Sequence, residues 1–367
     1  MKMSVPYVVF PQQVAKIKSE LMEAFESVLE SGMYVLGEQM VQFEEAFAQY
    51  CGTTYGAGVS NGTTGLYMVM YNMCIGPGDE VITAPNSFIA SAGSIGVLGA
   101  KPVFVDVCED LNIDPEKIEE AITPKTKAIM PVHLTGRPAR MNEINAIAKR
   151  HGLVVIEDAA QSVGAKYNGM RVGSLGDVAC FSLHPLKNLH AFGDGGVVTT
   201  SDSKIYNDIL MARNHGLKNR NESEFWSLNF RLDEIQAAML MVQLPLLDQW
   251  TAARRERAMR YNRLLSTYAD TPEENEGEFC VWQTYVVKVE RRDELLQYLQ
   301  ANGVQANVHY PIPLHVQKPA QYYGYKSDDF PVAMSLSRRI LSLPLYPEMT
   351  DDQQDYVVDL FRKFYGN

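Results

Sequence analysis

The sequence predicts an α/β protein, with a mainly parallel central sheet between helices in a large domain and a small α/β domain at the C-terminus. A length of 367 residues suits one large domain plus a smaller one. A content of 46% hydrophobic and 21% charged residues is typical of ordinary globular proteins. Near-continuous apolar runs alternate with helical patterns, which indicates parallel strands covered on both faces.

The elements of the large domain follow one another with clear punctuation. Apolar residues at helical spacing predict an opening helix over Gln13–Glu30, which Ser31-Gly32 ends. A strand-like segment, Gly56–Val59, then leads into a helix start. The further predicted strands are Glu80–Ala84, Pro102–Asp106, Ala128–Val132, Leu153–Glu157, Val178–Ser182 and Gly196–Thr200. The predicted helices between them are Phe88–Leu98, Pro115–Ala121, Met141–His151 and Lys204–Arg213.

The large domain is expected to end near Gln243, which divides the chain into residues 1–243 and 244–367. A long helical stretch, Asp233 to about Leu265, leads out of the first part. The second part contains a strand-like and two helix-like segments, Cys280–Val289, Arg292–Asn302 and Asp351–Phe364, with a Pro-rich turn region over Tyr310–Pro319.

Charge and cysteine usage exclude several classes of protein. A net charge of -11 argues against nucleic acid or an anionic membrane as a partner. The 5 cysteines are scattered without a CxxC pair, so we expect reduced thiols in a cytoplasm and neither a disulfide framework nor a metal site. We expect no secretory signal in the first residues and no membrane span.

Polar residues follow three of the predicted strands, where ligands gather in parallel α/β sheets. Ser60-Asn61-Gly62-Thr63 opens a helix and can bind phosphate, although plain N-capping is the favoured explanation of this motif taken alone. Asp158 ends a strand and can pair with a protonated ring nitrogen or merely cap a helix. Lys187 can condense with an aldehyde, but most lysines are solvated surface charges. Gly193-Asp194-Gly195-Gly196 is interpreted as a tight turn, since it is not a GxGxxG dinucleotide motif.

The combination is more specific than its parts. A phosphate-binding helix start, an aspartate and a lysine, in this order, are what a pyridoxal 5'-phosphate (PLP) site needs. This cofactor has a phosphate to anchor, a pyridine nitrogen to keep protonated and an aldehyde that condenses with an amine. We therefore predict a PLP enzyme in which Lys187 moves the proton as general base and acid.

The same motifs resemble the DegT/StrS sugar aminotransferases, a family with the aspartate-aminotransferase (type I) fold. The resemblance covers nearly the whole chain, and it is specific because several separated motifs occur in the family's order. These motifs include Tyr34-Val35-Leu36-Gly37, Ser60-Asn61-Gly62-Thr63, Glu157-Asp158-Ala159-Ala160-Gln161, Ser182-Leu183-His184-Pro185-Leu186-Lys187, Asn229-Phe230-Arg231-Leu232-Asp233 and His309-Tyr310-Pro311.

The resemblance implies a role for each cofactor-binding residue. It makes Lys187 the lysine that bonds covalently to the cofactor and places Asp158 at the pyridine nitrogen. Asn229 resembles an asparagine that reaches the phosphate from a neighbouring subunit, which implies a homodimer with shared sites. The other implied contacts are Gln161 to the ring hydroxyl, Phe88 on the ring face, and Gly62, Thr63 and Ser182 to the phosphate.

The resemblance also implies the substrates, L-glutamate as amino donor and a nucleotide-diphosphate keto-sugar as acceptor. The run from His309 to His315 looks more like members acting at the 3-keto than at the 4-keto position. Alternative interpretations of the function are a PLP-dependent sugar dehydratase or a non-catalytic regulator of the same fold. His133 is expected to make a structural hydrogen bond. The candidate substrate contacts, for which packing is an equal alternative, are Tyr34, Arg213, His309, Tyr310 and His315.

Overall fold

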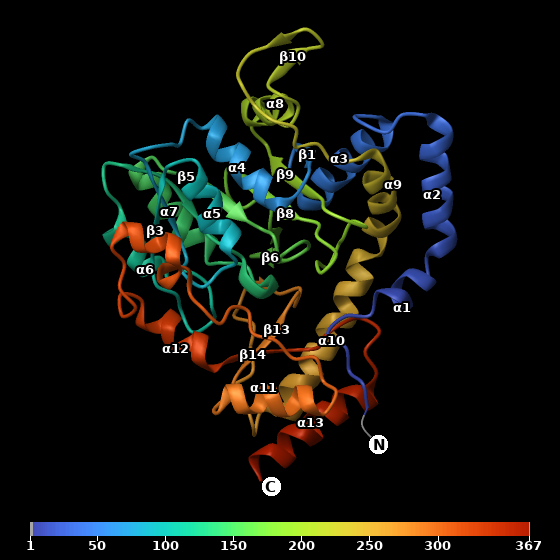
Figure 1. Ribbon diagram of the computed structural model, residues 1–367, viewed down its shortest axis with the longest axis vertical. Coiled ribbons are helices and arrows are strands. Elements are labelled where there is room, and N and C mark those ends of the chain that lie inside the picture. The colour runs from blue at the N-terminus through green and yellow to red at the C-terminus, as the bar shows by residue number, and fades with distance from the viewer. Residues whose placement is uncertain (1–2, 367) are drawn as a thin grey trace.

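A seven-stranded sheet forms the centre of the larger part of the molecule, as expected from the sequence (Figure 1). The structure is a computed structural model that describes residues 3–366. The strands lie in the order β1-β9-β8-β5-β4-β2-β3. Neighbours from β8 to β3 are parallel, whereas β9 is antiparallel to both β8 and β1. Their bounds are β1 Tyr55–Val59, β2 Glu80–Thr83, β3 Lys101–Phe104, β4 Thr126–Met130, β5 Val154–Asp158, β8 Val178–Ser182 and β9 Gly196–Thr200.

Both faces of this sheet are covered by helices. Successive strand residues point to opposite faces, so Ile129 of β4 packs in one buried cluster and Met130 in another. This explains why the strands are almost continuously apolar in sequence. The helices over the first face are α3 Glu38–Cys51, α6 Pro115–Ile118, α7 Met141–His151 and α9 Glu234–Gln243, and those over the second are α4 Gly62–Asn72, α5 Ile89–Val97 and α8 Ser203–Ala212.

Two predicted helices are interrupted in the structure. The opening segment forms α1 (Phe10–Ala15) and α2 (Lys18–Ser31), because the backbone leaves the helical conformation at Ile17, whose side chain is buried beside Trp250. The long stretch after Asp233 forms α9 and α10 (Leu247–Leu265), separated by a 3-10 turn at Leu244–Leu246. Pro245 occupies that turn, and its missing N–H prevents a regular helical hydrogen bond there.

The C-terminal part has its own hydrophobic core. The antiparallel pair β13 (Tyr285–Lys288) and β14 (Ile340–Leu343) packs with α11 (Arg292–Ala301) and α13 (Asp351–Tyr365). The C-terminal part also contains α12, Pro331–Arg339.

Two small antiparallel sheets lie outside these cores. One consists of β6 Lys166–Tyr167, β7 Met170–Arg171 and β12 Glu278–Phe279. The other is a hairpin of β10 Leu217–Asn219 and β11 Glu222–Ser223, which projects at the top of Figure 1.

The N-terminal segment lies beside the C-terminal part rather than with the large sheet (Figure 1). Val5 is completely buried in the C-terminal core and forms a parallel bridge with Val304. The division at residue 243 stays a prediction, but a boundary drawn along the sequence alone misses this return of the chain.

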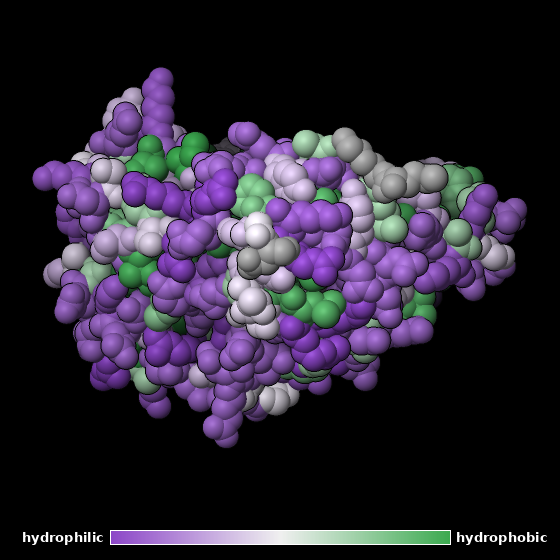
Figure 2. Space-filling view, turned by 90° about the horizontal axis from the view of Figure 1, so that it is seen from below, coloured by the Kyte–Doolittle hydropathy of each residue, from purple (hydrophilic) through white to green (hydrophobic). Residues whose placement is uncertain are grey.

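The surface seen from below is mostly hydrophilic, with hydrophobic residues in small separate groups (Figure 2). Within residues 3–366, no helix combines the length and the apolar character that crossing a bilayer would require.

Candidate active site

A cavity of about 600 Å³ lies at the carboxyl ends of the central parallel strands. Residues from the ends of β5 and β8, from the start of α4 and from the C-terminal part line it, so both parts of the molecule contribute. The structure brings nine of the predicted site residues to this cavity: Gly62, Thr63, Phe88, Asp158, Gln161, Ser182, Lys187, His309 and Tyr310.

Asp158 is a buried carboxylate that has no hydrogen bond to a cation among residues 3–366. It is the last residue of β5, where its Oδ2 accepts from the Ser91 hydroxyl at 2.7 Å and its Oδ1 from the Ala160 N–H at 3.2 Å. Burial raises the pKa of Asp158, and these two hydrogen bonds together with the charge of Lys187 oppose the rise. A carboxylate held in this way is suited to bind a protonated ring nitrogen.

Lys187 presents its amine to the same cavity from the turn after β8. The backbone N–H of Lys187 donates to the His184 carbonyl at 2.8 Å, which fixes the turn. Burial lowers the pKa of the Lys187 amine to about 8, while the charge of Asp158 acts in the opposite direction. A larger share of this amine is therefore unprotonated near neutral pH than in an ordinary lysine, which makes it a better nucleophile and base.

The start of α4 forms an anion cradle. Asn61 caps the helix by accepting from the Thr64 N–H at 2.9 Å, and the Thr64 hydroxyl accepts from the Asn61 N–H at 3.2 Å. In the described part of the chain, the N–H groups of Gly62 and Thr63 have no acceptor. A Cβ at Gly62 would lie 2.9 Å from the Ser182 Cβ, so glycine keeps this approach open. Free N–H groups at a helix start suit a phosphate.

Two further residues shape the wall around Asp158. The Gln161 amide oxygen accepts from the Thr135 N–H at 2.7 Å, and its nitrogen donates to the Tyr310 hydroxyl at 3.2 Å. The Phe88 ring is 53% exposed and lies 5.7 Å from the Tyr310 ring. An exposed aromatic face beside a polar cavity suits stacking on a planar ligand.

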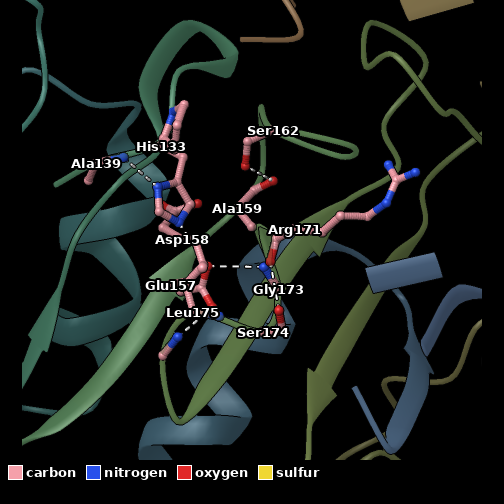
Figure 3. A network of polar contacts seen from close by, with 12 residues as sticks. His133, Ala139, Glu157, Asp158, Ala159, Ser162, Arg171, Gly173, Ser174 and Leu175 are labelled. Carbon is pink, nitrogen blue, oxygen red and sulfur yellow. Dashed lines mark hydrogen bonds and ion pairs between the residues drawn. The ribbon is translucent and has the colours of Figure 1, made fainter. Parts of the chain in front are cut away.

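His133 makes structural hydrogen bonds, as expected from the sequence, and belongs to a polar network around Glu157 (Figure 3). Its Nδ1 accepts from the Ala139 N–H at 2.9 Å, so Nε2 carries the proton and donates to Glu157, also at 2.9 Å. Glu157 accepts three more hydrogen bonds, from the N–H groups of Gly173, Leu175 and Gly176 at 2.8–3.0 Å. This fully paired carboxylate fixes the strand end that presents Asp158.

Four predicted site residues lie elsewhere in the structure. Arg213 is buried, forms an ion pair with Glu44 and donates to the Gly58 carbonyl at 2.9 Å. His315 is also buried, with its ring 4.8 Å from that of Phe330. The structure therefore does not support substrate contacts by these two side chains, because packing and pairing hold them away from the cavity. The other two, Tyr34 and Asn229, are on the surface and outside the cavity lining.

Other cavity residues were not anticipated. Ser91 follows Phe88 by three residues at the start of α5, a helical spacing that could have indicated it. Thr284 and Gln283 come from the C-terminal part, and Tyr7 comes from the N-terminal segment. No motif marks these three positions.

The residues present fit PLP. The anion cradle matches its phosphate, Asp158 its ring nitrogen, the Phe88 face its planar ring and the Lys187 amine its aldehyde. The free N–H groups at the start of α4 and the buried Asp158 carboxylate, which has no hydrogen bond to a cation among the described residues, are the observations on which this fit rests.

The sequence model of the DegT/DnrJ/EryC1/StrS aminotransferase family matches residues 15–362. Among curated relatives, a pleiotropic regulatory protein of Geobacillus stearothermophilus is 44% identical over 99% of both chains. The dTDP-3-amino-3,6-dideoxy-α-D-galactopyranose transaminase of Aneurinibacillus thermoaerophilus is 42% identical over 98% of this chain and 99% of its own.

Solved structures agree with this assignment. The crystal structure of DesV of S. venezuelae in complex with a ketimine intermediate has a TM-score of 0.96 and 39% identity, covering 99% of both chains. That of NtdA of Bacillus subtilis with bound cofactor PMP, the amino form of PLP, has a TM-score of 0.88 and 31% identity, covering 96% of this chain and 82% of that one. The chain thus belongs to the DegT/DnrJ/EryC1/StrS aminotransferase family and is a PLP-dependent sugar aminotransferase.

Proposed function

We propose that the protein transfers the amino group of L-glutamate to the 3-keto carbon of a deoxysugar linked to a nucleoside diphosphate. The observation that carries the proposal is that Lys187 and Asp158 meet in one cavity beside the anion cradle. The relative of Aneurinibacillus thermoaerophilus, whose name specifies a 3-amino sugar, supports the 3-keto position over the 4-keto position. The products of this reaction are an amino-sugar nucleotide and 2-oxoglutarate.

The cofactor, when bound, supplies an electron-accepting ring and carries the amino group between the two substrates. Lys187 Nζ takes the proton from the donor carbon that bears the amino group. In the second half of the reaction, the same nitrogen delivers a proton to the sugar carbon that receives the amino group. Its lowered pKa serves both directions, because an amine with a pKa of about 8 both accepts and releases a proton near neutral pH.

Asp158 acts by keeping a positive ring nitrogen in place. The Ser91 hydroxyl orients Oδ2 of Asp158. The pairing of β5 with β8, which includes Glu157 and Asp158, fixes the backbone of this residue. The anion cradle at Gly62 and Thr63 would hold the phosphate, and Gln161 and Phe88 would orient the ring. A dehydratase or a regulatory protein of this fold is a weaker proposal, since the chain retains a lysine with a lowered pKa where transamination needs it.

We further propose a homodimer in which Asn229 of one subunit completes the phosphate site of the other. Lys187 is the one lysine or arginine among the described residues that line the cavity, so the anion cradle offers a phosphate dianion backbone N–H donors but no arginine or second lysine from its own subunit. Asn229 follows the projecting β10–β11 hairpin, and Trp226 in the same segment is 88% exposed. Exposed apolar surface of this kind is typical of an interface. We place the reaction in the cytoplasm, which suits the five unpaired cysteines.

The reverse reaction tests the proposal directly. We expect dTDP-3-amino-3,6-dideoxy-α-D-galactose and 2-oxoglutarate to yield L-glutamate, measured with glutamate dehydrogenase. Lys187→Ala should abolish turnover, whereas Lys204→Ala, which removes an exposed lysine of α8, should leave it unchanged. Glutamate formation from a 4-amino nucleotide sugar but not from the 3-amino one would contradict the proposed position.

Shared sites are tested by complementation. The Lys187→Ala protein should be inactive alone and the Asn229→Ala protein weakly active, and mixing the two should restore activity at one of the two sites of the mixed dimer. An Asn229→Ala protein with normal PLP affinity would refute the shared phosphate site.

A further inference from the structure

Both sequence neighbours of Lys187 are tied to one short segment of the C-terminal part. The Gln283 amide nitrogen donates to the Leu186 carbonyl at 3.1 Å. On the other side of the lysine, the Asn188 amide nitrogen donates to the Val281 carbonyl, also at 3.1 Å. These two hydrogen bonds, the tethers, join residues that are 97 and 93 positions apart in the sequence. Lys187 is thus held from both sides by a distant part of the chain.

The segment that provides the tethers is itself firmly held. The Val281 N–H donates to the Gly136 carbonyl at 2.9 Å. The Gln283 amide oxygen accepts from the Thr284 hydroxyl at 2.8 Å, so its nitrogen is the atom that faces the lysine turn. Between these residues, Trp282 is buried in the C-terminal core, which holds its backbone at a φ of 47° that a bulky residue rarely adopts. The segment is therefore a fixed support.

The turn that carries Lys187 has weaker support of its own. The Lys187 N–H donates to the His184 carbonyl at 2.8 Å, and the Leu186 N–H donates to the His184 ring at 3.2 Å. Both His184 and Leu186 are exposed, and hydrogen bonds of the backbone that face solvent open easily. The tethers therefore decide how firmly the turn is held.

The surroundings of Asn188 show what its side chain contributes. The residue is only 5% exposed, and its Oδ1 is buried without a hydrogen-bond partner among the described residues. An unpaired buried oxygen costs stability, and a leucine of nearly the same shape would avoid that cost. Asn188 is also absent from the described residues that line the cavity. Neither stability nor contact with a ligand therefore accounts for an asparagine here, which leaves the hydrogen bond to Val281.

We propose that Asn188, together with Gln283, is a positioning residue for Lys187, and that the two tethers keep Nζ aligned with the carbon from which it takes the proton. The proposal rests on the function proposed above, because it states how the lysine is held for that proton transfer. A displacement of a reacting group by about 1 Å can lower a rate by about 100-fold. Binding of the substrate depends on other residues and should change little.

Asn188→Leu tests the proposal by removing one tether and the unpaired oxygen together. Conversion of the PLP form of the holoenzyme by L-glutamate is followed by absorbance in a single turnover. We expect the maximum rate to fall at least about tenfold, with the half-saturating glutamate concentration within about twofold of wild type. Deuterium on the carbon that bears the amino group should slow the variant at least as strongly as the wild type, because proton transfer is the impaired step. Gln283→Leu, which removes the other tether at a partly exposed position, should also lower the maximum rate.

Gln354 offers a matched control in α13. Its amide nitrogen donates to the Arg257 carbonyl at 2.9 Å, and its buried Oε1 has no partner among the described residues, so Gln354→Leu removes the same groups away from the cavity. This variant should keep the wild-type rate. In the cofactor-free proteins, the Lys187 N–H should exchange with deuterium faster in Asn188→Leu than in the wild type, and no faster in Gln354→Leu.

Several results would overturn the positioning role. These are an unchanged maximum rate in Asn188→Leu or Gln283→Leu, a smaller deuterium effect than in the wild type, or unchanged exchange of the Lys187 N–H. A rate loss that accompanies a lower urea midpoint in both variants would mark the two residues as structural and would also refute it.

Failure of the proposed function gives a different result. A wild-type holoenzyme converted by neither L-glutamate nor dTDP-3-amino-3,6-dideoxy-α-D-galactose refutes the function. If only the amino sugar converts it, glutamate is the wrong donor, and the amino sugar replaces it in the same comparison of variants. A wild type that responds, with Asn188→Leu equally fast, refutes the tethers alone.

Discussion

The Lys187 amine should titrate near pH 8 in the cofactor-free protein. Burial lowers its pKa from 10.5 to about 8, with the Asp158 charge opposing the shift. At pH 7, a pKa of about 8 leaves roughly 9% of the amine unprotonated, against roughly 0.03% for an ordinary lysine. The structure therefore predicts an increase of about 300-fold in the reactive form at this pH.

Competitive labelling with acetic anhydride, followed by peptide mass spectrometry across a pH series, measures this directly. Lys204 is an internal reference, because its exposed amine pairs with Asp208, which raises its pKa above that of an ordinary lysine. Asp158→Asn should move the Lys187 midpoint further down, since it removes the charge that favours the ammonium form. A Lys187 midpoint at or above the ordinary lysine value would refute the argument from burial.

Three other perturbations follow from the same geometry. The unfolded lysine keeps its proton up to about pH 10.5, whereas the folded one loses it near 8. The free energy of unfolding should therefore rise between about pH 8 and pH 10.5. In urea unfolding, the wild type should gain about 3 kcal/mol of this free energy relative to Lys187→Met across that pH range, and a difference that does not change with pH would contradict the argument. Gly62→Ala places a Cβ 2.9 Å from the Ser182 Cβ and should weaken PLP binding at least about tenfold in an absorbance titration. Gly93→Ala, where a Cβ meets no atom within 4 Å, is its control, and equal affinities would argue against the cradle. Glu157→Gln turns an amide nitrogen toward N–H donors and should lower the free energy of unfolding by about 2–4 kcal/mol, compared with exposed Glu276→Gln; an unchanged urea midpoint would be inconsistent with the network.

The half of the site built on the large sheet was predictable from the sequence. Asp158 and Lys187 each follow a buried strand, and parallel strands end at one edge, so their spacing in sequence becomes proximity in space. The helix start at Asn61 is a local signal of the same kind. These residues owe their positions to short-range structure, which periodicity and capping patterns report.

The remainder depended on contacts that no local pattern encodes. Tyr7 reaches the cavity through pairing with Gln305, 298 residues away. Arg213 is withdrawn because Glu44, on a helix far earlier in the chain, meets it in a buried ion pair. The two interrupted helices show the same limit, since the burial of Ile17 beside Trp250 is a tertiary contact. The family resemblance could suggest His315 as a substrate contact, but not that its ring turns toward Phe330.

The pairing of the first residues with residues near position 304 affects how the protein is made and handled. During synthesis, Val5 leaves the ribosome early. Gly303 and Gln305, whose backbone groups bond to Val5, leave it only when most of the chain has been synthesised. The wall that contains Tyr7 cannot close before then, so a nascent chain could assemble its large sheet without a finished substrate pocket. For the same reason, deleting the segment from Val5 to Tyr7 should impair catalysis despite leaving every recognisable motif intact.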